Sequence, residues 1–212
     1  MKIHISKTII AIIGLLSAGT IANAQAGAES LVLPKASGPN LYAEVGLGYI
    51  KDSIKDEDGG KAPSGLNNFY GISAAFGWRF AKEQKVQLEV GYYASSAKDS
   101  GDTIKGTAIP VLASYSYCFE LGQAGNDEIR VTPTAGIYSL KLKNSFDSVS
   151  GTPFAFGVGA GYTHHFSKLL YLDAGYRLLS RGSVKDTTDG YSYTVAKSAI
   201  MHCLNVSVGF KF

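Results

Sequence analysis

Seven charged residues are the first candidates for chemistry, because they recur on one face of segments whose side chains alternate in character. On that face they are mixed with glycine, serine and tyrosine, while the opposite face carries bulky apolar residues. The seven are Glu44, Arg79, Glu89, Arg130, Asp173, Arg177 and Lys211. If this face is enclosed, its charges must be paired or solvated. The sequence therefore predicts either an ion-pair network inside the protein or a charged ring that lines a pore.

Histidine and serine give no comparable pattern. His164 and His165 are adjacent, and adjacent strand residues point to opposite faces, so they cannot converge on one metal ion. His202 and Ser198 come nearest to a base and a nucleophile, but no third residue is placed to orient them. We therefore predict no catalytic residues, no cofactor and no metal site, and we expect that the protein is not an enzyme.

Acidic residues gather in one polar stretch that precedes Gly59-Gly60. They are Asp52, Asp56, Glu57 and Asp58, interleaved with Lys51, Lys55 and Lys61. Their spacing does not match the calcium-binding loop in which oxygen ligands recur at fixed positions. The mixture of charges favours a solvated loop, and its lysines are alternatively suited to the phosphate groups of lipopolysaccharide.

The first 24 residues have the pattern of a cleavable signal peptide. Lys2 and Lys7 precede an apolar run over 8–21, and Ala22-Asn23-Ala24 supplies the small residues of a cleavage site. We expect cleavage between Ala24 and Gln25. An uncleaved anchor is the alternative, but the run is shorter than the roughly 20 residues that a spanning helix needs.

The remaining 188 residues suit one domain, with no break in composition to divide it. Because two lysines leave with the signal peptide, 18 basic residues face 17 acidic ones. This near-neutral balance gives no reason to expect a nucleic-acid partner. We expect 25–39 to form an N-terminal periplasmic segment and 40–212 to form the folded domain.

Eight segments of that domain alternate with a period of two, which is typical of strands. In one of them Tyr70, Phe76 and Trp78 share a face, and Gly71 and Arg79 lie on the other. The eight segments span 41–50, 69–80, 86–95, 109–119, 129–140, 154–166, 170–178 and 204–212. Each has about the length that a tilted strand needs to cross a bilayer. The sequence therefore predicts an all-β fold, an eight-stranded antiparallel up-and-down transmembrane β-barrel.

Short and long connections alternate between these segments, as in outer-membrane barrels. The short ones, 81–85, 120–128 and 167–169, are expected in the periplasm. The long polar ones, 51–68, 96–106, 141–153 and 180–196, are expected outside the cell. Pro110 and Pro133 fall inside strand segments, where a missing N–H is poorly tolerated, so we expect both near strand ends or at bulges.

Volume decides which face points inward. Eight strands enclose a space that side chains only just fill, so the bulky apolar face must point outward, to lipid. The glycine-rich face points inward and leaves room for Tyr42, Tyr93, Tyr138 and Tyr171. A soluble carrier such as a lipocalin needs the opposite arrangement. In so narrow a barrel, an ion-pair network that plugs the lower lumen is favoured over an open pore.

The two cysteines, Cys118 and Cys203, are expected to be buried and free. Both should point inward, but from the fourth and eighth strands, which face each other across the barrel at different heights.

The C-terminal segment Leu204-Asn-Val-Ser-Val-Gly-Phe-Lys-Phe212 ends in an aromatic residue that follows alternating apolar residues. With Pro153-Phe-Ala-Phe-Gly-Val-Gly-Ala-Gly-Tyr162 and Leu172-Asp-Ala-Gly-Tyr-Arg-Leu178, it resembles the opacity-porin and outer-membrane protein A-like barrel superfamily. The resemblance covers 40–212. It implies a bacterial outer-membrane location, with lipid and lipopolysaccharide as surroundings. It also implies recognition by the barrel-assembly machinery, through Leu204, Val206, Val208, Phe210 and Phe212.

Taken together, these features favour a monomer with a structural or surface-interaction role in envelope integrity and attachment. The barrel would be largely plugged and would present four extracellular loops to an extracellular ligand. A narrow porin for small solutes is the alternative. A lipid-modifying outer-membrane enzyme is a further alternative, but no His-x-Ser constellation lies near the outer interface, and nothing orients the nearest candidates, His202 and Ser198, as a base and a nucleophile.

Overall fold

The fold was analysed in a computed structural model that describes residues 40–55, 63, 65–99, 101–121, 126–145, 148–188 and 191–212. The expected signal peptide, its cleavage site and the segment 25–39 lie outside these residues. Among the described residues no helix is long and apolar enough to cross a membrane.

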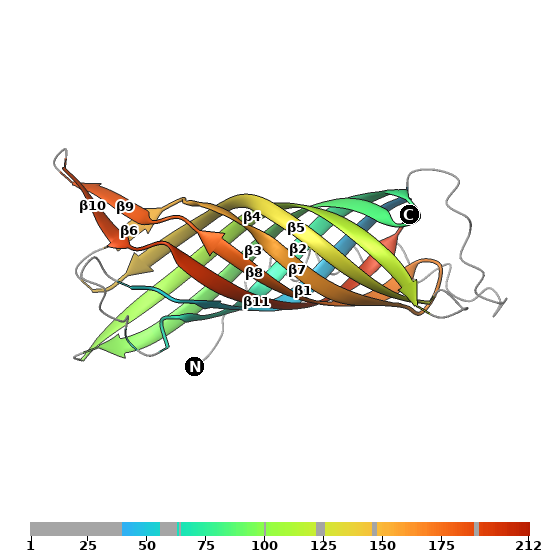
Figure 1. Cartoon of the computed structure of the whole chain (residues 1–212). Coiled ribbons are helices and arrows are strands. Elements are labelled where there is room, and N and C mark those ends of the chain that lie inside the picture. Colours follow the sequence, from blue (N-terminus) through green and yellow to red (C-terminus); the bar gives the residue numbers. More distant parts are fainter. Residues whose placement is uncertain are drawn as a thin grey trace. The chain divides into compact units, whose positions relative to one another are not determined.

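Eight antiparallel strands form a closed ring, in which each strand pairs with its neighbours in the sequence and the first strand pairs with the last (Figure 1). They are β1 (Asn40–Asp52), β2 (Asn68–Ala81), β3 (Gln84–Asp99), β4 (Asp102–Leu121), β5 (Asp127–Lys143), β7 (Phe154–His165), β8 (Leu170–Arg181) and β11 (Ala199–Lys211). Three short strands, β6 (Ser148–Gly151), β9 (Val184–Thr188) and β10 (Tyr191–Ala196), lie at one end of the barrel. The predicted eight-stranded antiparallel barrel is confirmed.

The two ends of the barrel differ. At the turn end, short connections at 82–83, 122–126 and 166–169 join the strands. At the loop end, longer connections at 53–67 and 144–153 and the β9–β10 hairpin extend from the ring. One expected loop is wrong, because most of 96–106 belongs to strands: β3 continues to Asp99 and β4 begins at Asp102. The alternation of buried and exposed residues continues there, with Ala97 and Gly106 buried, but polar side chains replace apolar ones on the outer face.

The expected position of the prolines is also wrong. Pro110 and Pro133 lie well inside β4 and β5, and the pairing register is the same on both sides of each proline. Pro110 has no ladder partner in β3 but stays paired with Tyr138 in β5, and Pro133 stays paired with Val158 in β7. The backbone nitrogen of a strand residue faces only one of the two neighbouring strands. Each proline therefore removes hydrogen bonding to one neighbour only, which leaves a local gap in that ladder and requires no bulge.

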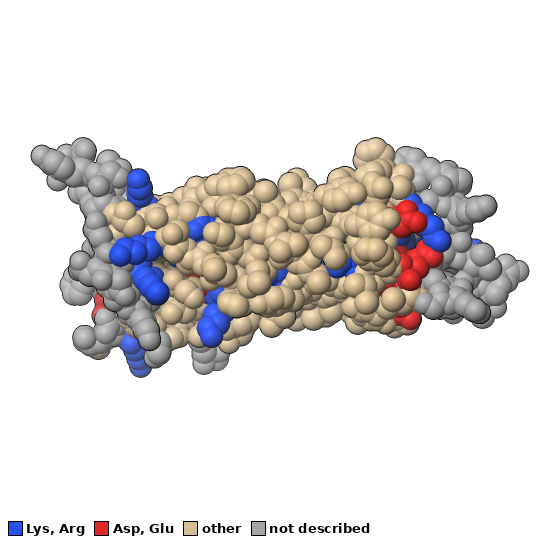
Figure 2. Space-filling model, viewed as in Figure 1, with Lys and Arg blue, Asp and Glu red and all other residues tan. Residues whose placement is uncertain are grey.

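The two faces of the barrel have opposite chemistry, as predicted. Leu47 on the outer face is 70% exposed, whereas the inward Tyr93 is only 3% exposed. Most of the outer wall between the ends is free of charged side chains in the view of Figure 2. The inward tyrosines lie over glycines, since a Cβ on Gly77 would overlap the ring of Tyr42 and one on Gly209 would overlap that of Tyr171. Glycine therefore provides the volume that the tyrosines fill.

Glycine is required most strictly where neighbouring backbone leaves no space. A Cβ added to Gly71 in β2 would lie 2.6 Å from Tyr93 Cα in β3 and still closer to the carbonyl oxygen of Tyr92. Gly71→Ala should therefore push β2 and β3 apart and lower the free energy of unfolding by about 1–3 kcal/mol. Urea unfolding of the protein in nonionic detergent, followed by the fluorescence of Trp78, measures this change.

Gly182→Ala is the matched control, because a Cβ there meets its nearest neighbour, Pro153 Cβ, at an ordinary 3.5 Å. Equal unfolding midpoints for the two variants would contradict the close approach of β2 and β3.

Candidate functional site

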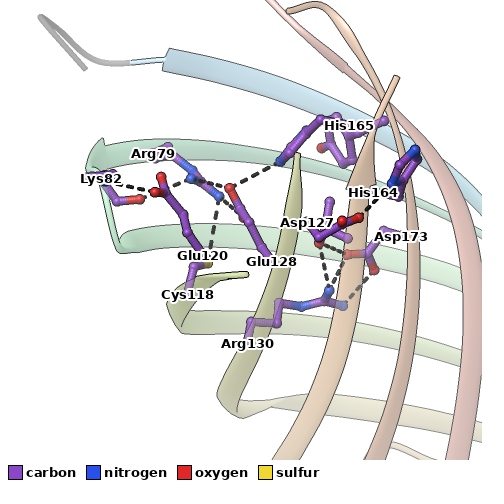
Figure 3. Close-up of polar contacts among 12 residues, drawn as sticks. Arg79, Lys82, Cys118, Glu120, Asp127, Glu128, Arg130, His164, His165 and Asp173 are labelled. Atoms are coloured by element: carbon purple, nitrogen blue, oxygen red, sulfur yellow. Dashed lines mark hydrogen bonds and ion pairs between the residues drawn. The ribbon is translucent and has the colours of Figure 1, made fainter. Parts of the chain in front are cut away.

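Ion pairs cross the turn end of the lumen between strands far apart in the sequence (Figure 3). The guanidinium of Arg79 in β2 forms an ion pair with Glu128 in β5, and its Nη1 donates a 2.8 Å hydrogen bond to Glu128 Oε1. His165 Nε2 in β7 lies 3.1 Å from the same carboxylate oxygen. Arg130 in β5 is ion-paired with Asp173 in β8, with Nη2 2.6 Å from Oδ1. Two arginines are thus neutralised at this level.

Glu44 is held at the same level without an arginine partner. The hydroxyl of Tyr171 donates a 2.8 Å hydrogen bond to Glu44 Oε1, and Ser207 Oγ and Gln87 Nε2 approach Oε2 at 3.4 Å. Glu44 is buried, so these polar contacts replace the water that would otherwise solvate its charge.

A third ion pair lies farther along the lumen. Arg177 Nη2 in β8 donates to both carboxylate oxygens of Glu89 in β3, at 2.7 and 2.9 Å. Of the seven charged residues singled out in the sequence, Arg79, Glu89, Arg130, Asp173 and Arg177 therefore all belong to ion pairs. Lys211 does not: its Nζ lies over the ring of Tyr171, 5.7 Å from the centroid.

Near the loop end, Asp52 and Arg181 form a pair that sequence analysis missed. Both side chains are 0% exposed, and Arg181 Nε donates a 2.8 Å hydrogen bond to Asp52 Oδ2. Arg181 Nη1 also donates to the carbonyl oxygens of Gly182 and Lys197. The expectation that Asp52 belongs to a solvated loop is wrong. The other acidic residues of that stretch, Asp56, Glu57 and Asp58, lie outside the described residues.

Glu128, Asp52 and Arg181 could have been found by extending the period of two. Glu128 shares the inward face of β5 with Arg130 and Thr132, and Asp52 follows the inward Ile50 by two residues. Each was assigned to a connection because polar residues near a strand end resemble a loop. The alternation of inward and outward side chains continues past the point where the outer face of the strand stops being apolar.

Apolar side chains close the lumen at the loop end. Ile54 and Leu66 come from the connection between β1 and β2, and Val184 and Ala196 come from β9 and β10; all four are buried. They pack with inward residues of the ring in one cluster that includes Phe69, Leu140, Leu179 and Met201. Within the lumen, the two cavities found measure only about 30 and 20 Å3. Cavities of this size hold single water molecules.

The cysteines and histidines make no further site. Cys118 in β4 and Cys203 in β11 are buried and unbridged, on strands that are opposite each other in the ring. His202 Nδ1 lies 2.7 Å from the hydroxyl of Tyr176. Ser198 is exposed. Among the described residues, no group of three or more histidine, cysteine, aspartate or glutamate side chains could hold a metal ion.

Four of the five residues of the expected assembly signal lie on β11, which closes the ring against β1, and Phe212 directly follows that strand. Leu204, Val206, Val208 and Phe212 are exposed on the outer wall, and Phe210 is half-buried. Their recognition by assembly machinery stays a prediction.

The turn end also carries a pair outside the lumen. Lys82 Nζ in the β2–β3 connection lies 2.8 Å from Glu120 Oε2 in β4 (Figure 3). The hydrogen bond that Lys82 donates to the Glu120 carboxylate raises the pKa of Lys82.

Comparison with known proteins agrees with this architecture. A model of the outer membrane protein beta-barrel domain matches residues 11–212. Neisserial surface protein A is a similar solved structure, with a TM-score of 0.53 at 18% identity over 83% of this chain and 98% of that one. Ail, the attachment invasion locus protein of Yersinia pestis, gives a TM-score of 0.53 at 15% identity over 82% of this chain and 99% of Ail. No curated protein sequence matches the chain at a significant level.

Removing one member of the buried pair near the loop end should be costly. In Asp52→Leu the guanidinium of Arg181 would stay enclosed without its carboxylate, so the free energy of unfolding should fall by about 3–5 kcal/mol. The double variant Asp52→Leu, Arg181→Met removes both charges and should recover most of that loss. Urea unfolding followed by Trp78 fluorescence measures both; a double variant no more stable than the single one would argue against the pair as the cause.

Proposed function

The chain belongs to the outer membrane protein beta-barrel domain family, and from this premise we propose that it acts at the bacterial cell surface as a closed barrel. The barrel lies in the outer membrane and presents its loop end to the outside of the cell. Its role is structural and interactive, and solutes do not pass through it.

Closure of the lumen from both directions is the observation that carries this proposal. At the loop end the apolar cluster around Leu66 and Phe69 fills the mouth. Below it the three ion pairs of Asp173, Glu89 and Glu128 with arginines join strands that are not neighbours in the ring, and that of Glu89 with Arg177 spans its full width. A conducting pore needs a continuous polar path, and apolar constrictions exclude water and ions.

The loop end is built as an extended platform. β3 and β4 continue past the apolar band as a hairpin, while β6 pairs with the last residues of β5 and β9 pairs with β10. Asp102 at the tip of the β3–β4 hairpin accepts a 2.6 Å hydrogen bond from Ser145 Oγ, in the connection that follows β5. This bond lowers the pKa of Asp102, so its carboxylate stays ionised and remains a hydrogen-bond acceptor at neutral pH.

Lysines on the outer wall of this platform indicate the kind of partner. Lys105 in β4 lies directly opposite Lys143 in β5, and Lys141 is next to them on the same face; all three are exposed. Like charges in direct register destabilise a sheet unless an anion neutralises them. They begin just beyond Ile109 and Ile137, where the apolar band ends and the phosphate groups of the outer leaflet lie. Figure 2 shows basic side chains at this end.

We take lipopolysaccharide phosphate to be that anion, and the loop tips to be free for a further extracellular ligand. Among the similar structures, Ail was solved with the heparin analogue sucrose octasulfate, a sulfated polyanion. The lysines of β4 and β5 give this chain a positively charged surface, which would likewise favour a polyanion.

Single-channel conductance of the purified protein in planar bilayers tests closure. We expect no steady current steps, because no continuous aqueous path crosses the apolar cluster. The heat-dependent electrophoretic shift of the same sample verifies that the barrel is folded and inserted. Reproducible steps from folded protein would overturn the proposal in favour of a narrow pore.

Reversing two of the lysine charges tests the partner. The double variant Lys105→Glu, Lys143→Glu should bind lipopolysaccharide at least about tenfold more weakly, since each lysine near an anionic surface contributes about 1 kcal/mol. Binding of purified lipopolysaccharide to the detergent-solubilised protein is measured by its effect on intrinsic fluorescence. Lys168→Glu, in the β7–β8 turn at the other end, is the matched control and should bind like the parent; equal loss in both variants would contradict a localised site.

A further inference from the structure

Two lysines are enclosed at the turn end of the lumen without a carboxylate. Lys85 in β3 is only 3% exposed, and Lys211 in β11 is half-buried. Within the described part of the chain neither forms an ion pair. Instead, Lys85 Nζ lies 5.2 Å from the ring centroid of Tyr42, and Lys211 Nζ lies 5.7 Å from that of Tyr171. A ring offsets only part of the cost of burying an ammonium group.

The surrounding charges do not balance these lysines. Arg79 is paired with Glu128, and Arg130 is paired with Asp173. Glu44 is the one buried carboxylate left at this level among the described residues; it accepts a hydrogen bond from Tyr171 and offsets the charge of one of the two lysines. One positive charge at this end of the lumen is therefore not neutralised by any described side chain.

The lysines border the cavity of about 30 Å3 at the turn end. Its lining consists of Tyr42, Arg79, Lys85, Thr163, His165, Tyr171 and Lys211, which includes no acidic residue. His165 supplies an independent sign of a missing partner. Its Nε2 is bound to Glu128, but its Nδ1 is buried without a hydrogen-bond partner. Buried polar atoms in folded proteins nearly always have a partner, so this atom indicates an occupant of the cavity.

The size of the cavity limits what that occupant can be. A volume of about 30 Å3 holds one particle of about the size of a water molecule. Phosphate and sulfate carry four oxygen atoms and are too large to enter without displacing the tyrosines. A water molecule fits and could form a hydrogen bond with His165 Nδ1, but it would not neutralise the excess positive charge of the lysines.

We propose that the turn-end mouth of the lumen binds one small inorganic anion, of the size of chloride, between Lys85, Lys211 and His165. The anion balances the one positive charge by which Lys85 and Lys211 exceed Glu44, and the unpartnered Nδ1 of His165 borders the same cavity. This site is separate from the proposed surface role, since it lies at the opposite end of the barrel. Its occupation draws β3, β7 and β11 together and seals the mouth that faces the periplasm.

Thermal unfolding of the purified full-length protein in nonionic detergent tests the site. Chloride is replaced stepwise by gluconate at constant ionic strength, and unfolding is followed by the electrophoretic shift. Chloride should raise the unfolding temperature by roughly 3 °C, because an anion that binds only the folded barrel stabilises it. Phosphate at the same ionic strength should behave like gluconate, because it is too large for the cavity.

Variants then locate the effect. Lys211→Gln and Lys85→Gln should each abolish the dependence on chloride, and in gluconate each should be at least as stable as the parent, since the repulsion is relieved. Lys168→Gln removes an exposed lysine from the neighbouring β7–β8 turn and should keep the full chloride effect.

Three results would overturn the proposal. They are a parent protein whose unfolding temperature does not depend on chloride, equal stabilisation by phosphate, and an unchanged chloride effect in both lysine variants. The chloride NMR line width gives a readout that needs no variant: the folded protein should broaden the line, and heat-unfolded protein should not. A line that folded protein leaves unbroadened would likewise count against the site.

Discussion

Closure of eight strands into one ring is the constraint on which the rest of the structure depends. Once β1 pairs with β11, every strand of the ring has a neighbour on both sides and the ring has no edge left to pair with other chains. The same closure fixes the diameter, and eight strands leave a space only as wide as the side chains that fill it. Every inward side chain must then find its partners among the others.

That shortage of space divides the lumen into two regions. Toward the loop end the inward residues are mostly apolar and enclose the pair of Asp52 and Arg181, and loop residues such as Leu66 and Val184 complete a small hydrophobic core. Toward the turn end they are charged, and arginines reach across to carboxylates on other strands. Tyr42 and Tyr171 line this region, with their rings over glycines of neighbouring strands. The interior thus resembles that of a small globular protein, while the exterior is the apolar wall.

The architecture could be predicted from the sequence because apolar and small or polar side chains alternate with a period of two along the strands. Tyr93 and Phe76 were assigned to opposite faces from parity alone, and the structure agrees. Two kinds of feature were not predicted from the sequence. Strand ends such as Asp52 and Glu128 look like loop residues in the sequence, because the outer face of the strand is polar there. The partners across the lumen were not predictable, since the stagger of the strands decides that Glu89 meets Arg177, 88 residues away.

The segments at the loop end have two roles: they close the lumen, and they form the surface that faces outward. Ile54 and Leu66 anchor both ends of the first connection in the core, and Val184 and Ala196 do the same for the β9–β10 hairpin. Segments anchored in this way are held at their bases by burial in the lumen. A partner that binds beyond these anchors need not open the barrel, and substitutions that spare the anchors leave the core intact. A filled lumen therefore lets the same segments complete the core with their bases and face the outside with the rest of their described residues.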